Sequence, residues 1–422
     1  MRNRYLYIML FIAGIMSFSY VGCGGASSTS GSSFVPADTD FVPTGLIAVP
    51  YSSSQINLTW SASTDTVGVI GYKVYCNDSQ VGTSSTASYN NTGLSPATNY
   101  TYTVAAYDAA DITSAQSPCV SATTLADSNL TLTLAGSYAT PAHALGIHVA
   151  GNYAYVADGA SGLLIIDISN PANPTLTGSI DTPGDAWNVY VSGAYAYVAD
   201  DWSGLQVINI SNPANPTLVG SYDTPGCSQD VYVVGAYAYV ADFSFGLQII
   251  NISNPTAPAL AGSYDTPNYA QGVYVAGDYA YVADEFTGLL IINIANPANP
   301  ALAGSYNTPG NAQDVYVSGA YAYVADNFSG LQIIDISNPA TPALAGSYRT
   351  ANQSDGVYVS GTYAYIADNH AGLRIINISN PAAPALTGSY NTPGCAKNVY
   401  ALGSYAYVAD YDLGGLQIIR IE

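Results

Sequence analysis

The chain has 422 residues, a length that accommodates two or three domains. Its 38 tyrosines, 40 glycines and 23 prolines favour strands joined by turns, and they predict an all-β protein. With 28 acidic residues against 7 basic ones and a net charge of −21, the chain cannot neutralise a run of phosphates, which argues against binding nucleic acid or anionic membrane surfaces.

Residues 1–22 have the pattern of a secretory leader. Arg2 and Arg4 supply its positive start, and a mostly apolar stretch follows that is too short to span a membrane as a stable helix. The stretch then runs Tyr-Val-Gly into Cys23, which resembles the bacterial lipoprotein signal. The resemblance implies cleavage before Cys23 and lipidation of its thiol, although Tyr20 replaces the usual aliphatic residue. An ordinary signal peptide is the alternative.

Residues 23–42 are rich in Gly, Ser, Ala and Thr, and they predict a flexible tether. Gly24 stands where Gram-negative lipoproteins that stay at the inner membrane commonly have Asp. The resemblance therefore implies an outer-membrane lipoprotein of the cell envelope, facing the periplasm or the outside, whose membrane contact is made through the lipid anchor only.

Residues 43–126 contain short alternating strands, one of which ends at Trp60. The segment from Leu94 to Val104 has a tyrosine, Tyr100, at the expected start of a strand. These features resemble a fibronectin type III domain. The resemblance implies that Trp60 packs between two sheets and that Tyr100 bonds back to the backbone as a tyrosine corner. Such domains in secreted bacterial proteins are usually spacers or weak adhesion modules.

Residues 129–422 contain a sequence repeat. The string Ala-Tyr-(Val/Ile)-Ala-Asp occurs seven times at intervals of 42 residues, with its aspartate at Asp158, Asp200, Asp242, Asp284, Asp326, Asp368 and Asp410. Each period holds four short strand patterns, which is typical of a propeller blade. The sequence therefore predicts a seven-bladed β-propeller after the sandwich domain.

The ends of the repeat array predict how the ring closes. The segment 132–138 copies a fourth strand ahead of the first complete repeat, whereas the chain ends on a third strand. We expect the N-terminal copy to complete the last blade. Within each blade we expect the repeated aspartate, such as Asp326, to bond the backbone of its own turn, and Gly330 to supply a positive φ.

The strings Leu163–Asp167 and Leu331–Asp335 resemble the LVIVD repeat family, which is close to the YVTN-type surface propellers. The resemblance covers residues 129–422. Those families occur on bacterial and archaeal surface proteins and mostly have no assigned activity, so the resemblance implies the fold far more than the function.

Few residues suggest a catalytic or metal-binding site. The histidines His143, His148 and His370 fall at different repeat positions, so the repeat builds no metal cluster from them, and His148 takes a slot that is tyrosine in the other six blades. We interpret the repeated aspartates as turn caps rather than metal ligands. No phosphate-binding loop, metalloprotease motif or nucleophile elbow appears, and we expect no metal and no cofactor.

The positions where the blades differ indicate a candidate binding face. Connections from strand four to the next strand one and from strand two to strand three share one side of the disc, and exposed aromatic and polar residues gather there. Drift in unconstrained loops is an equally weighted explanation. The candidate ligand-binding residues are Trp187, Trp202, Asn188, Asp230, Asp314, Phe286, Phe328 and Lys397.

The sequence thus predicts a non-enzymatic binding or scaffolding module for a protein or glycan ligand. The alternative is a propeller enzyme acting on polysaccharide or a small substrate, which would need one set of unlike residues in a single cleft. Cys227 and Cys395 lie three blades apart, too far for a disulfide, whereas pairing of Cys76 with Cys119 stays open.

Overall fold

The computed structural model describes residues 41–51, 53–64, 68–110, 112–124, 130–412 and 414–422, which form two compact units divided near residue 125. The predicted leader and the lipidation site Cys23 lie outside the described residues. The described part of the chain is all-β, as the sequence composition predicted, and contains 35 strands. Within it, no helix has the length and apolar character needed to cross a membrane.

The first unit is a sandwich of two antiparallel sheets, which confirms the fibronectin type III prediction. One sheet has the order β1-β2-β5 and the other the order β4-β3-β6-β7. The strands are β1 (Thr44–Pro50), β2 (Gln55–Ser61), β3 (Val69–Cys76), β4 (Ser79–Ser84), β5 (Ser88–Thr92), β6 (Asn99–Asp108) and β7 (Val120–Thr123).

Trp60 is buried in the sandwich, with its ring edge-on to Tyr72 at a centroid distance of 5.1 Å. Alternating residues Ile56, Leu58 and Trp60 of β2 all face this core. The tyrosine-corner role of Tyr100 stays a prediction. Cys76 and Cys119 carry thiols rather than a disulfide, with Cys76 buried, so the structure does not support their pairing.

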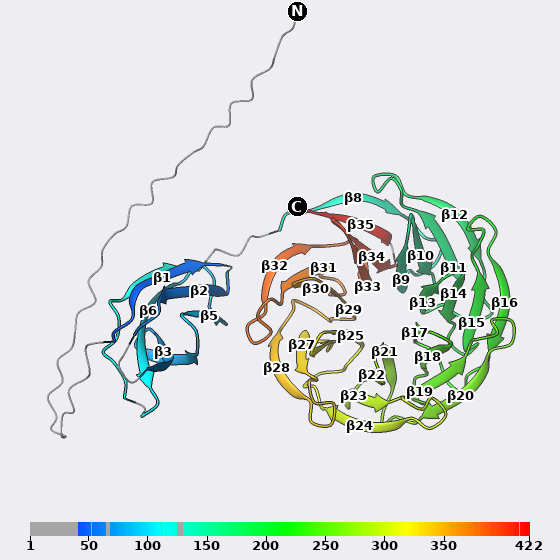
Figure 1. Ribbon diagram of the computed structural model, residues 1–422. Helices are drawn as coiled ribbons and strands as arrows, with labels where there is room; N and C mark the ends of the chain where they lie inside the picture. Colours follow the sequence, from blue (N-terminus) through cyan, green and yellow to red (C-terminus); the bar gives the residue numbers. More distant parts are fainter. Residues whose placement is uncertain (1–40, 52, 65–67, 111, 125–129, 413) are drawn as a thin grey trace, which may run out of the picture. The chain divides into compact units, whose positions relative to one another are not determined.

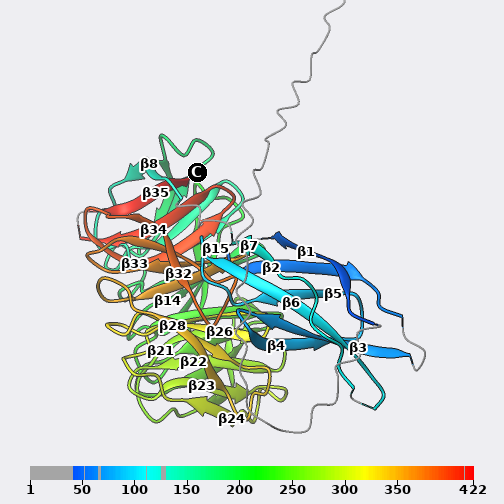
Figure 2. The same ribbon diagram turned by 90° about the vertical axis from the view of Figure 1, so that its left-hand side faces the viewer.

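The second unit is a closed ring of seven four-stranded antiparallel sheets, which confirms the predicted propeller (Figure 1). Figure 2 shows the same ring from the side as a disc. The innermost strands are β9 (Gly146–Ala150), β13 (Asn188–Ser192), β17 (Asp230–Val234), β21 (Ala270–Ala276), β25 (Asp314–Ser318), β29 (Gly356–Ser360) and β33 (Cys395–Leu402).

The other three strands of each blade follow outwards. The second strands are β10 (Tyr153–Ala157), β14 (Tyr195–Ala199), β18 (Tyr237–Ala241), β22 (Tyr279–Asp284), β26 (Tyr321–Ala325), β30 (Tyr363–Ala367) and β34 (Tyr405–Tyr411). The third are β11 (Leu163–Asp167), β15 (Leu205–Asn209), β19 (Leu247–Asn251), β23 (Gly288–Asn293), β27 (Leu331–Asp335), β31 (Leu373–Asn377) and β35 (Gly415–Ile421). The outermost are β12 (Thr175–Ile180), β16 (Thr217–Tyr222), β20 (Ala259–Tyr264), β24 (Ala301–Tyr306), β28 (Ala343–Tyr348), β32 (Ala385–Tyr390) and β8 (Leu132–Tyr138).

The repeated Tyr-Ala-Tyr-Val-Ala strand explains why the blades stack. Successive side chains of a strand point to opposite faces, so Ala322 and Val324 of β26 pack against the preceding blade while Tyr323 and Ala325 pack against the following one. Each of the seven blade junctions has an apolar cluster of this kind. Both faces of every blade are therefore buried by its neighbours, as in other repeat architectures.

The two ends of the repeat array close the ring, as predicted. β8 pairs with β35 in an antiparallel register that runs from Tyr138 opposite Leu416 to Leu132 opposite Ile421. The resulting blade packs on the first one through a cluster that joins Tyr407 and Ile418 to Ile147 and Val156. The junction that closes the ring is thus built like the other six.

The predicted role of the repeated aspartates was wrong in one respect. Their carboxylates bond the backbone of the connection that enters the same blade from the previous outermost strand rather than that of their own turns, although Asp158 and Asp284 also bond the side chains of Ser161 and Thr287 in their turns. Asp326 accepts hydrogen bonds from Thr308 Oγ1 at 2.6 Å and from Gly310 N at 2.8 Å. All seven aspartates are fully buried, and their burial raises their pKa values. Backbone bonds close the turn itself, including Ser329 N to Asp326 O at 2.9 Å.

A glycine in the outermost strands provides a test of ring closure. A Cβ at Gly136 of β8 would overlap the carbonyl oxygen of Pro171 in the first blade. We expect Gly136→Ala to lower the free energy of unfolding by about 1–3 kcal/mol, because backbone must move to admit the methyl group. Calorimetry of the propeller transition in the full chain measures this change.

The matched control is Gly388→Ala, at the equivalent position of β32. There the nearest atoms to a Cβ belong to the Leu130 and Leu132 side chains, at 3.3 Å, so the loss should be clearly smaller. Because both changes replace a strand glycine by alanine, intrinsic strand preference cancels. Equal losses at the two positions would contradict the packing of β8 described here.

Candidate functional site: the channel and the connection face

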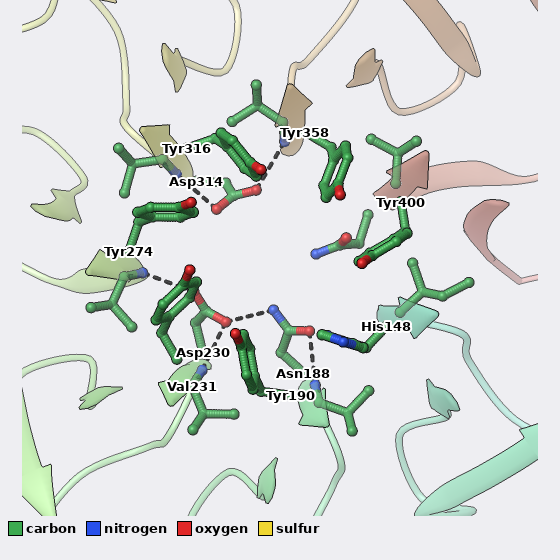
Figure 3. Close-up of a pocket in the computed structure, with 18 residues that line it drawn as sticks. His148, Asn188, Tyr190, Asp230, Val231, Tyr274, Asp314, Tyr316, Tyr358 and Tyr400 are labelled. Atoms are coloured by element: carbon green, nitrogen blue, oxygen red, sulfur yellow. Dashed lines mark hydrogen bonds between the residues drawn. The ribbon is translucent and has the colours of Figure 1, made fainter. Parts of the chain in front are cut away.

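The innermost strands surround a central channel lined by a closed ring of seven aromatic side chains. Neighbouring ring centroids are 4.5–5.2 Å apart. Figure 3 shows these side chains arranged around the channel axis. They come from the same position of each blade: His148, Tyr190, Tyr232, Tyr274, Tyr316, Tyr358 and Tyr400.

His148 fills the tyrosine slot of the first blade, as predicted. Its ring contacts Tyr190 and Tyr400 at centroid distances of 4.9 and 5.2 Å. Burial lowers its pKa to about 4, because the cationic form would lose its hydration inside the ring. The imidazole is therefore neutral at ordinary pH and packs as an aromatic ring. Burial at the blade junctions, away from the channel, raises the pKa of Tyr323 and its equivalents in the other blades, whose hydroxyls stay protonated.

Two residues earlier in each inner strand, a second layer of residues narrows the channel. Its members are Gly146, Asn188, Asp230, Gly272, Asp314, Gly356 and Asn398. The glycines are required by crowding, since a Cβ at Gly146 would lie 2.6 Å from Asn188 Cα and one at Gly272 would lie 2.9 Å from Asp314 Cα. The layer has room for side chains at only some of its seven positions.

Asp230 and Asp314 use that room to join neighbouring blades. Asp230 accepts from Val231 N of its own blade at 2.7 Å, from Val273 N of the next blade at 2.8 Å, and from Asn188 Nδ2 at 2.6 Å. Asp314 accepts from Val315 N and Val357 N at 2.7 and 2.9 Å. Figure 3 shows both carboxylates beside the tyrosine ring.

Burial raises the pKa of both carboxyls despite these donors, and the pKa of Asp314 is raised further by the charge of Asp230. Asp230 is 8% exposed, so the residue predicted as part of an open binding surface is almost closed off from solvent. The two acids form one electrostatic unit at the narrow part of the channel.

The mouth of the channel brings together five of the eight predicted ligand-binding residues. A pocket of about 120 Å³ is lined by Trp187, Asn188, Asp230, Asp314 and Lys397, together with Gln229, Gln271 and Gln313, which stand at the position of Trp187 in their blades. Lys397 donates to Asp355 Oδ2 at 2.8 Å and lies 6.0 Å from the centre of the Tyr411 ring. Trp187 is 38% exposed at the rim of this pocket.

The other three candidates lie on turn tips away from the mouth. Trp202, Phe286 and Phe328 are 70%, 57% and 61% exposed. Six isolated bridges, such as Asp201 with Ser228, join these turns to the neighbouring connections, which confirms that both kinds of loop share one face. Phe328 also lines a groove of about 640 Å³ with Leu344 and Arg349 between two blades. The structure therefore separates the predicted set into a mouth group and a rim group.

One pairing was missed by sequence reasoning. Cys395 Sγ lies 3.2 Å from His370 Nδ1, a contact between the turn of one blade and the connection that enters the next. The neighbouring bridge between Asn369 and Ala396 places them together, and the same spacing recurs in the other blades, so the repeat carried the signal. Burial raises the pKa of the Cys395 thiol, which opposes the thiolate that a nucleophile needs.

His143 is also placed by the fold rather than by any motif. Its ring stacks on Tyr411 at a centroid distance of 4.1 Å and an angle of 19°. Its Nδ1 atom is 3.8 Å from Asp412 Oδ1. Nowhere in the described residues do three or more His, Cys, Asp or Glu side chains gather in a group able to hold a metal ion.

Family models match both units. The LVIVD repeat model matches residues 141–182, 183–224, 225–266, 267–308, 309–350, 352–392 and 393–421, more than half of the chain. The fibronectin type III model matches residues 41–121. These matches agree with the two units of the structure.

The curated relatives match through the fibronectin type III part. Exoglucanase B of Cellulomonas fimi is 47% identical over 85 residues, which are 20% of this chain and 8% of that protein. Chitinase Chi52 of Paenibacillus xylanexedens is 41% identical over 107 residues, 25% of this chain and 20% of that protein. An α-amylase of Niallia circulans is 40% identical over 100 residues, 24% of this chain and 8% of that protein. The chain thus spans a fifth or less of each relative's length.

Among solved structures, the β-propeller domain of Cps50 (Swd1) from Myceliophteria thermophila superposes with a TM-score of 0.56 at 13% identity. The superposition covers 69% of this chain and all of that one. The computationally designed protein Ika8 gives a TM-score of 0.52 at 7% identity, covering 91% of this chain and 98% of that chain. At such low identity these likenesses concern the fold alone.

The channel acids give a pH prediction with a definite sign. Since burial raises the pKa of Asp230 and Asp314, the folded chain holds their protons more tightly than the unfolded chain does. Their ionisation opposes folding, so the free energy of unfolding should increase as the pH falls from above the raised pKa values towards the ordinary value of about 3.9. Urea denaturation at a series of pH values measures this dependence.

Asp314→Asn should reduce that dependence, because it removes the carboxyl whose ionisation is opposed by both burial and Asp230, while the repeat aspartates such as Asp326, whose pKa values burial also raises, keep their share of it. The control is Asp278→Asn, at an exposed hairpin on the opposite face of the disc, and this change should leave the pH dependence of the unfolding free energy as it is in the wild type. An Asp314→Asn variant that keeps the full pH dependence would show that the channel acids are not its source.

Proposed function

The chain belongs to the LVIVD repeat family, and from this premise we propose that it is a lipid-anchored, non-enzymatic binding module of the cell envelope. In this proposal a protein or glycan ligand binds the connection face of the propeller, and the fibronectin type III domain acts as a spacer. Both kinds of domain fit a binding or scaffolding role.

The observation that carries the proposal is the concentration of unlike residues on one face. The strands repeat almost unchanged from blade to blade, whereas the mouth and rim groups differ between blades and expose aromatic rings. Trp187 at the mouth and Trp202 on a turn tip belong to the same blade. Exposed aromatic rings next to polar side chains are what a sugar ring or a partner side chain stacks on.

The anchor is part of the proposal and rests on the sequence at Cys23. Named relatives that share the fibronectin type III part include an exoglucanase and a chitinase, and this likeness favours an exported chain. Gly24 after the cysteine favours the outer membrane.

The enzyme alternative has one specific observation in its favour, the contact between Cys395 and His370. A thiol beside an imidazole is the arrangement of a cysteine nucleophile and its base. The raised pKa of the thiol and its burial argue against that use. We therefore favour binding over catalysis, and loss of a turnover activity in Cys395→Ser would reverse this preference.

The anchor is tested by Cys23→Ser expressed in a Gram-negative host. We expect the wild-type chain in the membrane fraction, shortened at its N-terminus and labelled by a fatty-acid probe. The variant should stay uncleaved or leave the membrane fraction, because the lipidated thiol is gone. Cys119→Ser, at an exposed cysteine, is the matched control. A Cys23→Ser chain that fractionates with membranes in mature form would refute the anchor.

The binding face is tested once a pull-down from envelope extract or a glycan array identifies a ligand. Trp187→Ala or Trp202→Ala should weaken binding by about 2 kcal/mol or more, roughly thirtyfold, if the ring is a stacking platform. The control is a paired change of Asn212 and Asn338 to Ala in the loops of the opposite face. Full affinity in both tryptophan variants with loss in the asparagine pair would move the site to the other side of the disc.

A further inference from the structure

The channel is a narrow cavity with a wall of aromatic rings and polar groups and a polar entrance. Its volume at the aromatic ring is about 220 Å³, below the roughly 300–1,000 Å³ of sites that hold whole small molecules. The adjoining mouth adds about 120 Å³. Such a space admits one slender group rather than a sugar ring or a folded peptide.

Hydrogen-bond acceptors face this space at two depths. At the upper depth, nearer the mouth, are the carboxylates of Asp230 and Asp314. A carboxylate has about four lone-pair positions, and the N–H groups of Val315 and Val357 occupy two of those of Asp314. Asp230 keeps fewer, since Asn188 donates to it as well. At the lower depth, the labelled tyrosines of Figure 3 turn their hydroxyls towards the channel, and neighbouring hydroxyls of the ring also hydrogen-bond one another. Hydroxyls can accept as well as donate hydrogen bonds.

When Asp230 and Asp314 ionise, their negative charge has no cationic partner among the described residues that hydrogen-bond them. At the mouth, Lys397 forms an ion pair with Asp355 at 2.8 Å, so this cation is already compensated. Asp230 and Asp314 receive only neutral donors in the described structure. Neutral N–H groups orient a carboxylate but leave its charge uncompensated, and a cation entering the channel would supply what they do not.

We infer that the channel binds a primary ammonium group on a slender alkyl stem, with the ammonium between Asp230 and Asp314, above the tyrosine ring, and the stem in the mouth pocket beside Trp187. This inference rests on the proposed function and names the chemistry that the mouth of the same face recognises. A lysine side chain of a protein partner and a free alkyl amine share this chemistry.

The donor pattern distinguishes an ammonium from other cations. A primary ammonium carries three donors on a compact charge, which suits two carboxylates and a ring of hydroxyls that lie around one axis. A quaternary ammonium has no donor for them. An anion would meet two carboxylates of its own sign. Aromatic rings also attract a cation, so the tyrosine ring adds to the binding.

The stem favours an alkyl amine over an amino sugar. The amine of an amino sugar is fixed directly to a bulky ring, which would have to enter a channel crowded enough to require glycine at position 272. A lysine-like stem lets the ammonium reach the carboxylates while the bulk of the partner stays at the mouth, where Trp187 is exposed. Binding of an amino-sugar oligomer is therefore the contrary outcome.

The groups that face the site define how binding should depend on pH. Besides Asp230 and Asp314 they are His148, Lys397, Asp355 and the ring tyrosines. Burial lowers the pKa of His148 to about 4 and raises the pKa of four ring tyrosines, so these groups stay neutral near pH 7, and Lys397 is paired with Asp355. Ionisation of the two channel acids is what changes, so affinity for the amine should increase as the pH rises from 5 to 8.

The experiment measures binding of Nα-acetyl-lysine methylamide and of 1,5-diaminopentane to the purified full-length chain by calorimetry or ligand-observed NMR. Both should bind at pH 8, whereas the norleucine analogue, which lacks the ammonium, should not. Asp230→Asn and Asp314→Asn should each weaken binding by about tenfold or more. Asp278→Asn on the opposite face should bind as the wild type does. Melting curves of each variant verify that it is folded.

Tighter binding of the lysine amide than of diaminopentane supports a partner's lysine as the source, and the reverse supports a free amine. Amine binding that is unchanged in both folded aspartate variants, or binding of glucosamine oligomers in place of both amines, overturns the inference. If an envelope ligand requires Trp187 but no amine binds, this inference fails and the proposed function stands. If amines bind through Asp314 but no envelope ligand needs the connection face, the proposed function fails instead.

Discussion

Burial of both faces of every blade by its neighbours is the constraint on which this propeller depends. A single 42-residue blade exposes Tyr, Val and Ile on two sides, and no blade can cover both by itself. Stacking the blades removes these faces from water, but an open stack would leave two uncovered ends. Ring closure through β8 and β35 removes those ends and the long sheet edges, and the junction it creates has the same apolar composition as the others.

The same ring explains why buried carboxylates recur in every blade. The connection that enters a blade must turn from the perimeter to the axis, and its backbone donors lose water on the way. Asp200, Asp326 and their equivalents receive these donors at fully buried positions. The connections are thereby fixed at their bases, so the loops that vary between blades stand on a rigid frame. A binding surface built this way needs little ordering when a ligand arrives.

The channel shows what happens when seven copies converge on one axis. Near the axis the side chains of the seven copies crowd each other. The residue type therefore stays nearly the same between blades where an aromatic ring fits, at Tyr316 and its equivalents. It differs between blades where seven side chains do not fit. Glycine at 146, 272 and 356 leaves space that Asn188, Asp230, Asp314 and Asn398 occupy. The asymmetry that a ligand would recognise therefore arises from a steric limit of a symmetric fold.

The sequence alone determined the two domains, the number of blades and the closing strand, because hydrophobic alternation and a 42-residue period can be read directly from the order of residues along the chain. It also indicated that His148 substitutes for a ring tyrosine. The tertiary structure decided which distant residues meet. It moved the repeated aspartates from turn caps to buried acceptors of another loop, and it divided the predicted ligand residues into mouth and rim groups. It brought Cys395 to His370 and buried Asp230, because contacts and desolvation depend on how blades converge in space rather than on the order of residues along the chain.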